Sequence, residues 1–280
     1  MWAMIKNFKI FIFIFTIFFT SHVNAKPIPP GAGEGDVAAN ILFLVDSSAS
    51  MGRWIGSDGL GRVRGVSYDS NGNILIGQNA RRAAGAVIRY TSAGARDTSF
   101  TPIRRIPRGG CGQHIDPRRN IMNQRFRKAS TVKFVDNAIN NEGIIFIVSQ
   151  ERRLLNYVFG FSENGRNCRF AISGSQGGRM FDIDVKNIGG TNYLFMAGIR
   201  NRTRGYFKVT NLTTMQSTYT EFNNRNHITR RYHRLSVNND ASRIYFSDAA
   251  NGGDLVGYAL NPSGPSFALG NEVIRCEAVN

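Results

Sequence analysis

The chain has 280 residues, 42% of them hydrophobic, and its 35 Lys and Arg exceed its 19 Asp and Glu by a formal charge of +16. This length is enough for one large domain or two small ones with a substantial buried core. The composition is rich in Gly, Asn, Ser, Phe and Ile and lacks long helical periodicity, which argues against a helical protein and favours an all-β one.

Residues 1–25 have the pattern of a secretory signal peptide. Lys6 and Lys9 precede a nearly unbroken apolar run over 10–19, and Val-Asn-Ala at 23–25 supplies small residues at a cleavage site. The run is too short to cross a hydrocarbon core of roughly 30 Å as a helix. We expect cleavage after Ala25, with no transmembrane segment left and a secreted, periplasmic or cell-surface location. An uncleaved N-terminal anchor is the alternative.

Residues 26–40 contain three prolines and three glycines and are predicted to form a linker. A strand pattern over 41–45 then runs into the string Asp-Ser-Ser-Ala-Ser at 46–50. This string resembles the opening of a von Willebrand factor A domain, where it begins a metal-ion-dependent adhesion site. The resemblance implies Asp46, Ser48 and Ser50 as ligands of Mg²⁺ or another divalent cation, because carboxylate and hydroxyl oxygens suit such hard ions.

The sequence after this motif does not continue as an A domain, because no later alternation of strands and helices follows it. Three interpretations of residues 41–60 stay open. The segment is the first strand of an A domain interrupted by another module, a remnant of such a domain, or the hairpin of an incomplete blade.

Residues 61–280 contain four copies of a β-rich unit of about fifty residues, a period typical of propeller blades. The predicted first strands lie at 63–68, 132–135, 181–185 and 235–237, the second at 73–78, 143–149, 193–198 and 243–248, and the third at 86–90, 156–161, 206–209 and 255–260. Turns rich in Gly and Asn join the first strand to the second. The sequence therefore predicts an all-β, propeller-like array of about four to five antiparallel blades. A fifth blade would be completed by 41–55 pairing with 273–278, which would protect the sheet edges.

The first copy has a family resemblance of its own. Its Asp69-Ser-Asn-Gly-Asn73 turn and its Asp97-Thr-Ser-Phe100 ending resemble bacterial propeller repeats whose blades end in this way. The order of leader, A-domain signature and propeller is similar to that of type IV pilus tip adhesins. This resemblance implies an exported adhesion protein.

The positive charge is concentrated in one region. Residues 53–128 contain fifteen Lys or Arg and four Asp, a net charge of +11, and 104–128 is predicted to be a long basic loop. Such a surface would attract an anionic polymer through salt-sensitive attraction, although no specific nucleic-acid motif is present. A generally Arg-rich proteome is the alternative explanation. Cys111, Cys168 and Cys276 allow at most one internal disulfide, and the pairing stays open.

No catalytic set is predicted. His114, His227 and His233 show no metal-binding spacing, and Cys111-Gly-Gln-His114 favours a loop turn over a metal half-site. Asp182 and Asp184 share one face of a strand by period two, without a recognisable partner for acid–base chemistry.

The leading hypothesis is an exported, non-enzymatic binding or adhesion protein of the cell envelope, with a metal-dependent adhesion motif and a protein or polysaccharide ligand at the cell surface. The alternative is a propeller enzyme, a lyase or hydrolase that acts on envelope or extracellular polysaccharide.

Overall fold

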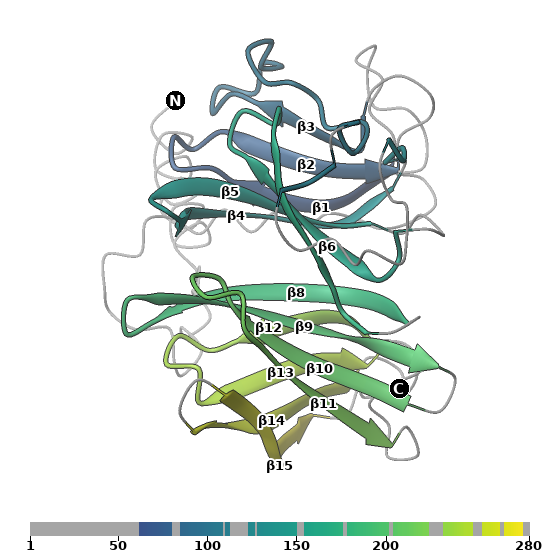
Figure 1. Ribbon diagram of the computed structural model, residues 1–280, viewed down its shortest axis with the longest axis vertical. Helices are drawn as coiled ribbons and strands as arrows, with labels where there is room; N and C mark the ends of the chain where they lie inside the picture. The colour runs from purple at the N-terminus through teal and green to yellow at the C-terminus, as the bar shows by residue number, and fades with distance from the viewer. Residues whose placement is uncertain are drawn as a thin grey trace, which may run out of the picture. The chain divides into compact units, whose positions relative to one another are not determined.

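The computed structural model describes residues 62–79, 85–108, 110–112, 123–126, 128–149, 154–175, 178–201, 204–223, 232–248, 254–263 and 266–276. The chain divides into two units, Met1–Val45 and Asp46–Asn280, and all of these residues belong to the second. The predicted signal peptide, linker and A-domain-like segment lie outside the described residues. Within the described ranges every regular element is a strand (Figure 1), so none of them holds a helix that could span a membrane.

The strands form four antiparallel sheets, which we call blades I to IV in chain order. Blade I contains β1 (Arg62–Tyr68), β2 (Ile74–Asn79) and β3 (Val87–Tyr90). Blade II contains β4 (Ala129–Ile139), β5 (Glu142–Ser149), β6 (Tyr157–Ser162) and β7 (Cys168–Ser173). Blade III contains β8 (Arg179–Ile188), β9 (Thr191–Asn201), β10 (Arg204–Asn211) and β11 (Ser217–Asn223). Blade IV contains β12 (Tyr232–Val237), β13 (Arg243–Asp248), β14 (Asp254–Ser263) and β15 (Ser266–Cys276).

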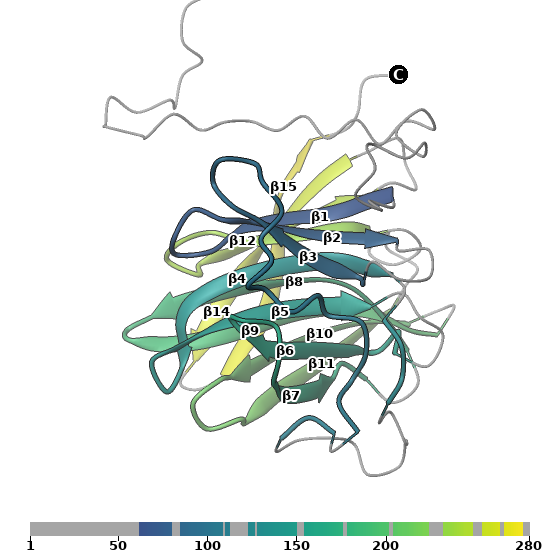
Figure 2. The ribbon, with the colours of Figure 1, turned by 90° about the horizontal axis from the view of Figure 1, so that it is seen from above.

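Each blade is a meander in which every strand pairs with the next one along the chain, and the four blades have a β-propeller arrangement (Figures 1 and 2). The predicted all-β class and blade number are confirmed. The predicted first, second and third strands of all four copies coincide with the first three strands of the blades.

The sequence prediction was incomplete at the outer edge of the blades, because it placed only three strands in each copy and assigned 273–278 to a separate fifth blade. Blades II, III and IV each carry a fourth strand, namely β7, β11 and β15. In β15, Ile274 pairs with Gly257 and Cys276 with Leu255 of β14. Residues 273–276 therefore belong to the outer strand of blade IV, and the segment 41–55 predicted to pair with them lies outside the described residues.

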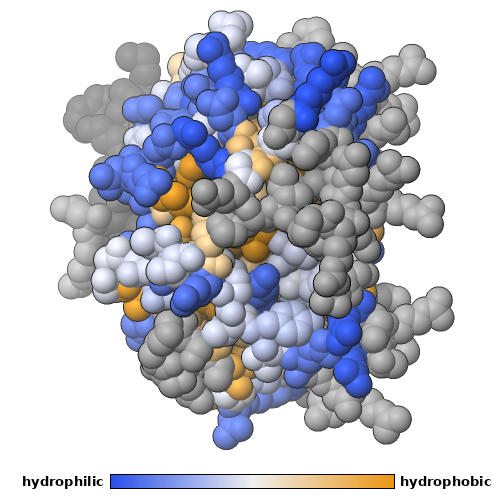
Figure 3. All heavy atoms as spheres, in the orientation of Figure 1, coloured by the Kyte–Doolittle hydropathy of each residue, from blue (hydrophilic) through white to orange (hydrophobic). Residues whose placement is uncertain are grey.

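Three hydrophobic cores lie between consecutive blades. Along β5, Ile145 and Ile147 enter the core shared with blade I, whereas Ile144, Phe146 and Val148 enter the core shared with blade III. Because successive side chains of a strand point to opposite faces, a strand between two cores has to be apolar at every position. This double burial explains the unbroken apolar run of β5. In the view of Figure 3, hydrophilic side chains cover most of the described surface.

The described parts of the basic segment 104–128, which was predicted to be a long loop, contain no regular strand and are tied to the core at both ends. Ile106, Cys111 and Phe126 are buried in the core between blades I and II. The ring of Phe126 meets that of Phe159 edge-on, with 4.9 Å between centroids. The segment could therefore be predicted as irregular, but its anchoring residues could not be recognised among so many charges.

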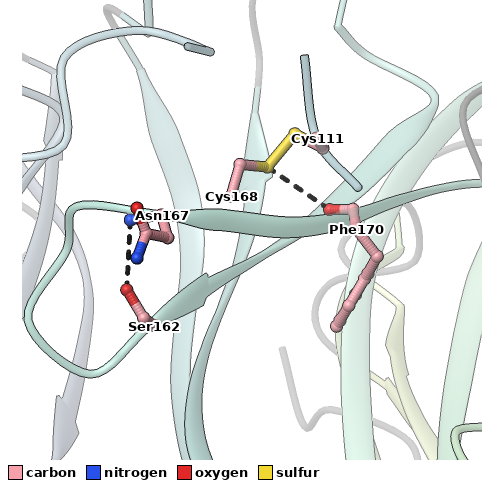
Figure 4. The surroundings of a disulfide bond; sticks show 5 residues. All are labelled: Cys111, Ser162, Asn167, Cys168 and Phe170. Atoms are coloured by element: carbon pink, nitrogen blue, oxygen red, sulfur yellow. Dashed lines mark hydrogen bonds between the residues drawn. A yellow bond between two sulfur atoms is a disulfide. The ribbon is translucent and has the colours of Figure 1, made fainter. Parts of the chain in front are cut away.

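A disulfide joins Cys111 of this segment to Cys168 at the start of β7 (Figure 4). Beside it, the backbone N–H of Asn167 donates to Ser162 Oγ at 3.1 Å, which fixes the turn that leads into β7. The pairing settles the choice among the three cysteines and leaves Cys276 as an exposed thiol. It also excludes Cys111 as a metal ligand, while His114 of the predicted loop turn lies outside the described residues.

In blade I, Arg89 joins the two parts of the repeat motif, the Asp69–Asn73 turn and the Asp97–Phe100 ending. Arg89 of β3 donates from Nη1 to Asp69 Oδ2 at 3.1 Å and from Nε to Asp97 Oδ2 at 2.7 Å. Its guanidinium lies over the Phe100 ring, 5.0 Å from the centroid. The Asp69 carboxylate also accepts from the backbone N–H of Asn73 at 2.8 Å, which confirms the predicted hairpin turn. These residues therefore stabilise the blade.

Candidate functional site: a charged cluster on the innermost strands

The predicted metal ligands Asp46, Ser48 and Ser50 lie outside the described residues. In the part of the chain that the structure describes, no three His, Cys, Asp or Glu side chains gather closely enough to hold a metal ion. Asp182 and Asp184 are the candidates from the sequence whose side chains can be placed. Both belong to β8, the innermost strand of blade III.

The two carboxylates complete the hydrogen bonding of the neighbouring blade. β12 is the innermost strand of blade IV and pairs with β13 on one side only, so the N–H groups on its other edge need acceptors. Asp182 Oδ2 accepts from the backbone N–H of Leu235 at 2.9 Å, and Asp184 Oδ2 accepts from that of Val237 at 2.8 Å. The two carboxylates therefore supply the hydrogen-bond acceptors that a paired strand would otherwise provide at this edge of β12.

The same two side chains reach the preceding blade. Thr131 Oγ1 of β4 donates to Asp182 Oδ1 at 2.5 Å, and Lys133 Nζ donates to Asp184 Oδ1. Blades I and II are joined in a similar way, because the N–H of Phe134 in β4 donates to Ser67 Oγ of β1 at 2.9 Å. Side chains of the innermost strands thus link each described blade to the next.

Two further cations complete this arrangement. Arg234 of β12 donates to the carbonyl of Arg64 in β1 at 2.8 Å, and its Nη1 lies 4.0 Å from Asp182 Oδ1. Lys186 Nζ lies 3.9 Å from Asp184 Oδ2 and donates to Asn239 Oδ1 at 3.3 Å. We call the whole set the inner-strand cluster: Thr131, Lys133, Asp182, Asp184, Lys186 and Arg234.

Acids and bases of the cluster differ in exposure. The side chains of Asp182 and Asp184 are 6% and 3% exposed, whereas those of Arg234, Lys133 and Lys186 are 55%, 34% and 23% exposed. The three cations therefore outnumber the carboxylates and also provide the solvent-facing part of the cluster. Each carboxylate oxygen already accepts a hydrogen bond from the protein.

Burial shifts the pKa values of two groups in the cluster, Asp182 and Lys133. It raises the pKa of Asp182, although the Thr131 hydroxyl, Arg234 and the Leu235 N–H favour the charged form. Burial, with a smaller contribution from Lys186, lowers the pKa of Lys133 to about 8 against the opposing effect of Asp182. The arrangement can hold an anion on its exposed cations, and its carboxylates are occupied by structural contacts.

Sequence reasoning identified the two aspartates but not Thr131, Lys133 or Arg234. A signal was available, because polar residues alternate with apolar ones along three of the innermost strands, as in Thr131-x-Lys133 and Asp182-x-Asp184. Such an alternation on an inner strand indicates one face turned away from the hydrophobic cores.

The strand order defines the class of the protein, a β-propeller, and its innermost strands carry the charged cluster. No family model matches the sequence, and no curated protein matches it.

Solved propeller structures are similar at low identity. The β-propeller domain of Cps50 (Swd1) from Myceliophteria thermophila is 8% identical with a TM-score of 0.41, over 77% of this chain and 71% of that one. A putative 6-phosphogluconolactonase from Bacteroides uniformis is 12% identical with a TM-score of 0.47, over 80% and 59%. The periplasmic gluconolactonase PpgL from Pseudomonas aeruginosa is 9% identical with a TM-score of 0.38, over 78% and 71%. The chain thus spans only 59% of the Bacteroides uniformis protein, and the class rests on the strand order alone.

Proposed function

We propose that this chain is an exported, non-enzymatic binding protein of the cell envelope that holds an anionic ligand, with acidic polysaccharide as the expected class. The observation that carries the proposal is the division of roles in the inner-strand cluster. Its carboxylates are buried and occupied by contacts between blades, whereas Lys133, Lys186 and Arg234 retain exposed surface. The net charge of +11 over residues 53–128 would add long-range attraction.

Two features support export. Residues 1–25 have the signal-peptide pattern, and the Cys111–Cys168 disulfide is of the kind that persists in oxidising compartments. Cell fractionation with mass spectrometry of the N-terminus tests this part. A mature protein that begins at Lys26 outside the cytoplasm is expected, and an unprocessed cytoplasmic chain would contradict it.

The ligand class is tested by titrating the protein with oligogalacturonate at two salt concentrations. Replacing Lys186 and Arg234 together by Gln should weaken binding about tenfold and reduce its salt dependence. Arg243→Gln is the matched control, because Arg243 is an exposed cation of β13 outside the cluster. Equal binding by the double variant and the control would refute the proposed role of the cluster.

Residues Asp46, Ser48 and Ser50 are proposed to bind Mg²⁺ as part of an adhesion site, supported by the chemistry of this donor set alone. Calorimetric titration of the mature protein with Mg²⁺ or Mn²⁺ should give heat of binding that Asp46→Ala abolishes. A titration without heat would exclude the metal site while leaving the anion-binding proposal intact.

An enzyme acting on envelope or extracellular polysaccharide is the second candidate, and Lys133 is the observation that favours it. Burial lowers the pKa of this lysine to about 8, near the range in which a side chain serves as a general base. Incubation with acidic polysaccharides, followed by an assay for new chain ends, distinguishes the two functions. Turnover that is lost in Lys133→Gln would replace the binding proposal by the enzymatic one.

A further inference from the structure

A second polar cluster lies where blade III packs against blade II, on the face of β9, β10 and β11 that meets β6 and β7. In this sheet Tyr206 pairs with Glu221 and Lys208 with Tyr219, and directly paired residues share a face. The face is turned toward blade II, because Tyr206 Oη donates to Asn156 Oδ1 at 3.4 Å and Lys208 Nζ donates to the carbonyl of Ser173 at 2.6 Å.

Tyr219 presents an aromatic ring to solvent in a fixed orientation. Its side chain belongs to an outer strand and is 41% exposed. The ring stacks on the fully buried Tyr206, with centroids 5.8 Å apart and an interplanar angle of 21°. Its hydroxyl donates to Glu221 Oε1 at 3.1 Å. A tyrosine held in this way loses little conformational entropy on binding, and its π-face suits the C–H face of a sugar ring.

The position of Tyr206 depends on a glycine. Gly198 of β9 pairs with Tyr206, and a Cβ at this position would lie 2.7 Å from the tyrosine ring and 2.2 Å from the carbonyl oxygen of Arg179. Because Gly198 has no side chain, the ring of Tyr206 can lie against β9. In this position the Tyr206 ring stacks on the buried side of the Tyr219 ring.

Lys208 lies directly across the strand pair from Tyr219. Among the described residues no carboxylate is within salt-bridge distance of its ammonium, and burial lowers its pKa. An ammonium group has three donors, of which the bond to the Ser173 carbonyl uses one. A partly buried cation without a counter-charge is unfavourable, and a carboxylate brought by a ligand would relieve this cost.

Two arginine side chains hold Glu221 next to the ring of Tyr219. Glu221 receives a hydrogen bond from Arg200 and a second from Arg204 Nη1, the latter at 3.1 Å. The Arg204 side chain is 56% exposed, and its guanidinium has N–H donors beyond the one that Glu221 accepts. Sugar hydroxyls donate and accept hydrogen bonds, so adjacent Arg and Glu groups match them.

We infer that this rim cluster of Tyr219, Lys208, Glu221, Arg200 and Arg204 binds one carboxylated sugar residue. The sugar ring stacks on Tyr219, its carboxylate pairs with Lys208, and its hydroxyls meet Glu221 and Arg204. The inference extends the proposed function to a second site that shares no residue with the inner-strand cluster, so either site can fail without the other.

The test uses trigalacturonic acid and the matched neutral galactose trimer as probes, with binding measured by calorimetry on the mature protein. Tyr219→Ala should weaken binding of the acidic trimer about tenfold, whereas Tyr219→Phe should retain it, because the ring is kept. Measured in the Lys186 and Arg234 double variant, so that the inner-strand cluster does not contribute, Lys208→Met should remove the preference for the acidic trimer over the neutral one. Tyr68→Ala, which removes a comparably exposed tyrosine of β1, is the control.

Three outcomes would overturn the inference: equal binding of both trimers by the unaltered protein, unchanged binding by Tyr219→Ala, or an unchanged acid preference in Lys208→Met. The Lys186 and Arg234 double variant separates the two sites. If it loses oligogalacturonate binding while Tyr219→Ala does not, the proposed function stands and the rim cluster is excluded. The reverse result would leave the rim cluster as the binding site.

Discussion

Asp182 offers the sharpest test of the structural role assigned to the inner-strand carboxylates. Asp182→Ala leaves the buried N–H of Leu235 and the Thr131 hydroxyl without their acceptor. A buried donor that loses its partner costs about 1–3 kcal/mol, so we expect the free energy of unfolding to fall by about 3 kcal/mol. Asp182→Asn keeps an oxygen for Leu235, and its amide can donate to a rotated Thr131 hydroxyl, so it should cost under about 1 kcal/mol.

Urea unfolding of both variants at pH 7, with the disulfide intact, measures these differences. An Ala variant within about 0.5 kcal/mol of the unaltered protein would refute the argument that the carboxylate completes the edge of β12. The Asn variant is the matched control, because it conserves shape and hydrogen bonding and removes only the charge.

The titration of Asp182 gives the free energy of unfolding a pH dependence of defined sign. Burial raises the pKa of Asp182 above its ordinary value of 3.8, so the folded protein binds this proton more tightly than the unfolded chain does. Stability contributed by the group therefore falls as pH rises from 3.8 to the folded pKa and is constant above it. Asp182→Asn should gain stability relative to the unaltered protein over that interval. Parallel stability curves would show that Asp182 titrates alike in both states.

Three further outcomes are expected. Replacing Cys111 and Cys168 together by Ser opens a link across 57 residues and should lower the unfolding free energy by about 4 kcal/mol on the chain-entropy account, measured by urea unfolding against the oxidised protein. Arg89→Ala, which leaves two largely buried carboxylates without their cation, should cost about 3–5 kcal/mol, and a thermal midpoint unchanged from that of the unaltered protein would contradict this. Affinity for oligogalacturonate in a Tyr219→Ala background should decline from pH 7 to 9 as Lys133 loses its proton, and Lys133→Gln should remove the decline.

The sequence predicted those strands whose burial leaves a strong pattern. The apolar run of β5 is recognisable because both of its faces enter a core, and the polar turns before the second strands mark the hairpins. The outer strands β7 and β11 were missed for the opposite reason. β11, with the sequence Ser-Thr-Tyr-Thr-Glu-Phe-Asn, contains strand-forming Thr, Tyr and Phe, but it lies at an outer edge and has several partly exposed side chains, so it lacks the apolar run that marks an inner strand.

The candidate sites were harder to predict, because their residues act through partners far along the chain. Asp182-x-Asp184 is visible in the sequence, but two aspartates on one strand face fit catalysis, metal binding and structural capping equally well. Only the neighbouring strands decide among these roles. In the rim cluster, Lys208 looks ordinary in sequence, since the absence of a carboxylate near it among the described residues is a property of the folded sheet.

The spacing of the contacts nevertheless follows the repeat. Thr131 and Lys133 precede their aspartate partners by 51 residues, and the aspartates precede Leu235 and Val237 by 53. Both separations are close to the blade period, because equivalent positions of consecutive innermost strands lie side by side. Ser67 and Phe134 are 67 residues apart, and the surplus corresponds to the inserted segment 104–128. A polar residue on one inner strand therefore identifies its partner about one period further along the chain, and this rule would have joined Thr131-x-Lys133 to Asp182-x-Asp184 from the sequence alone.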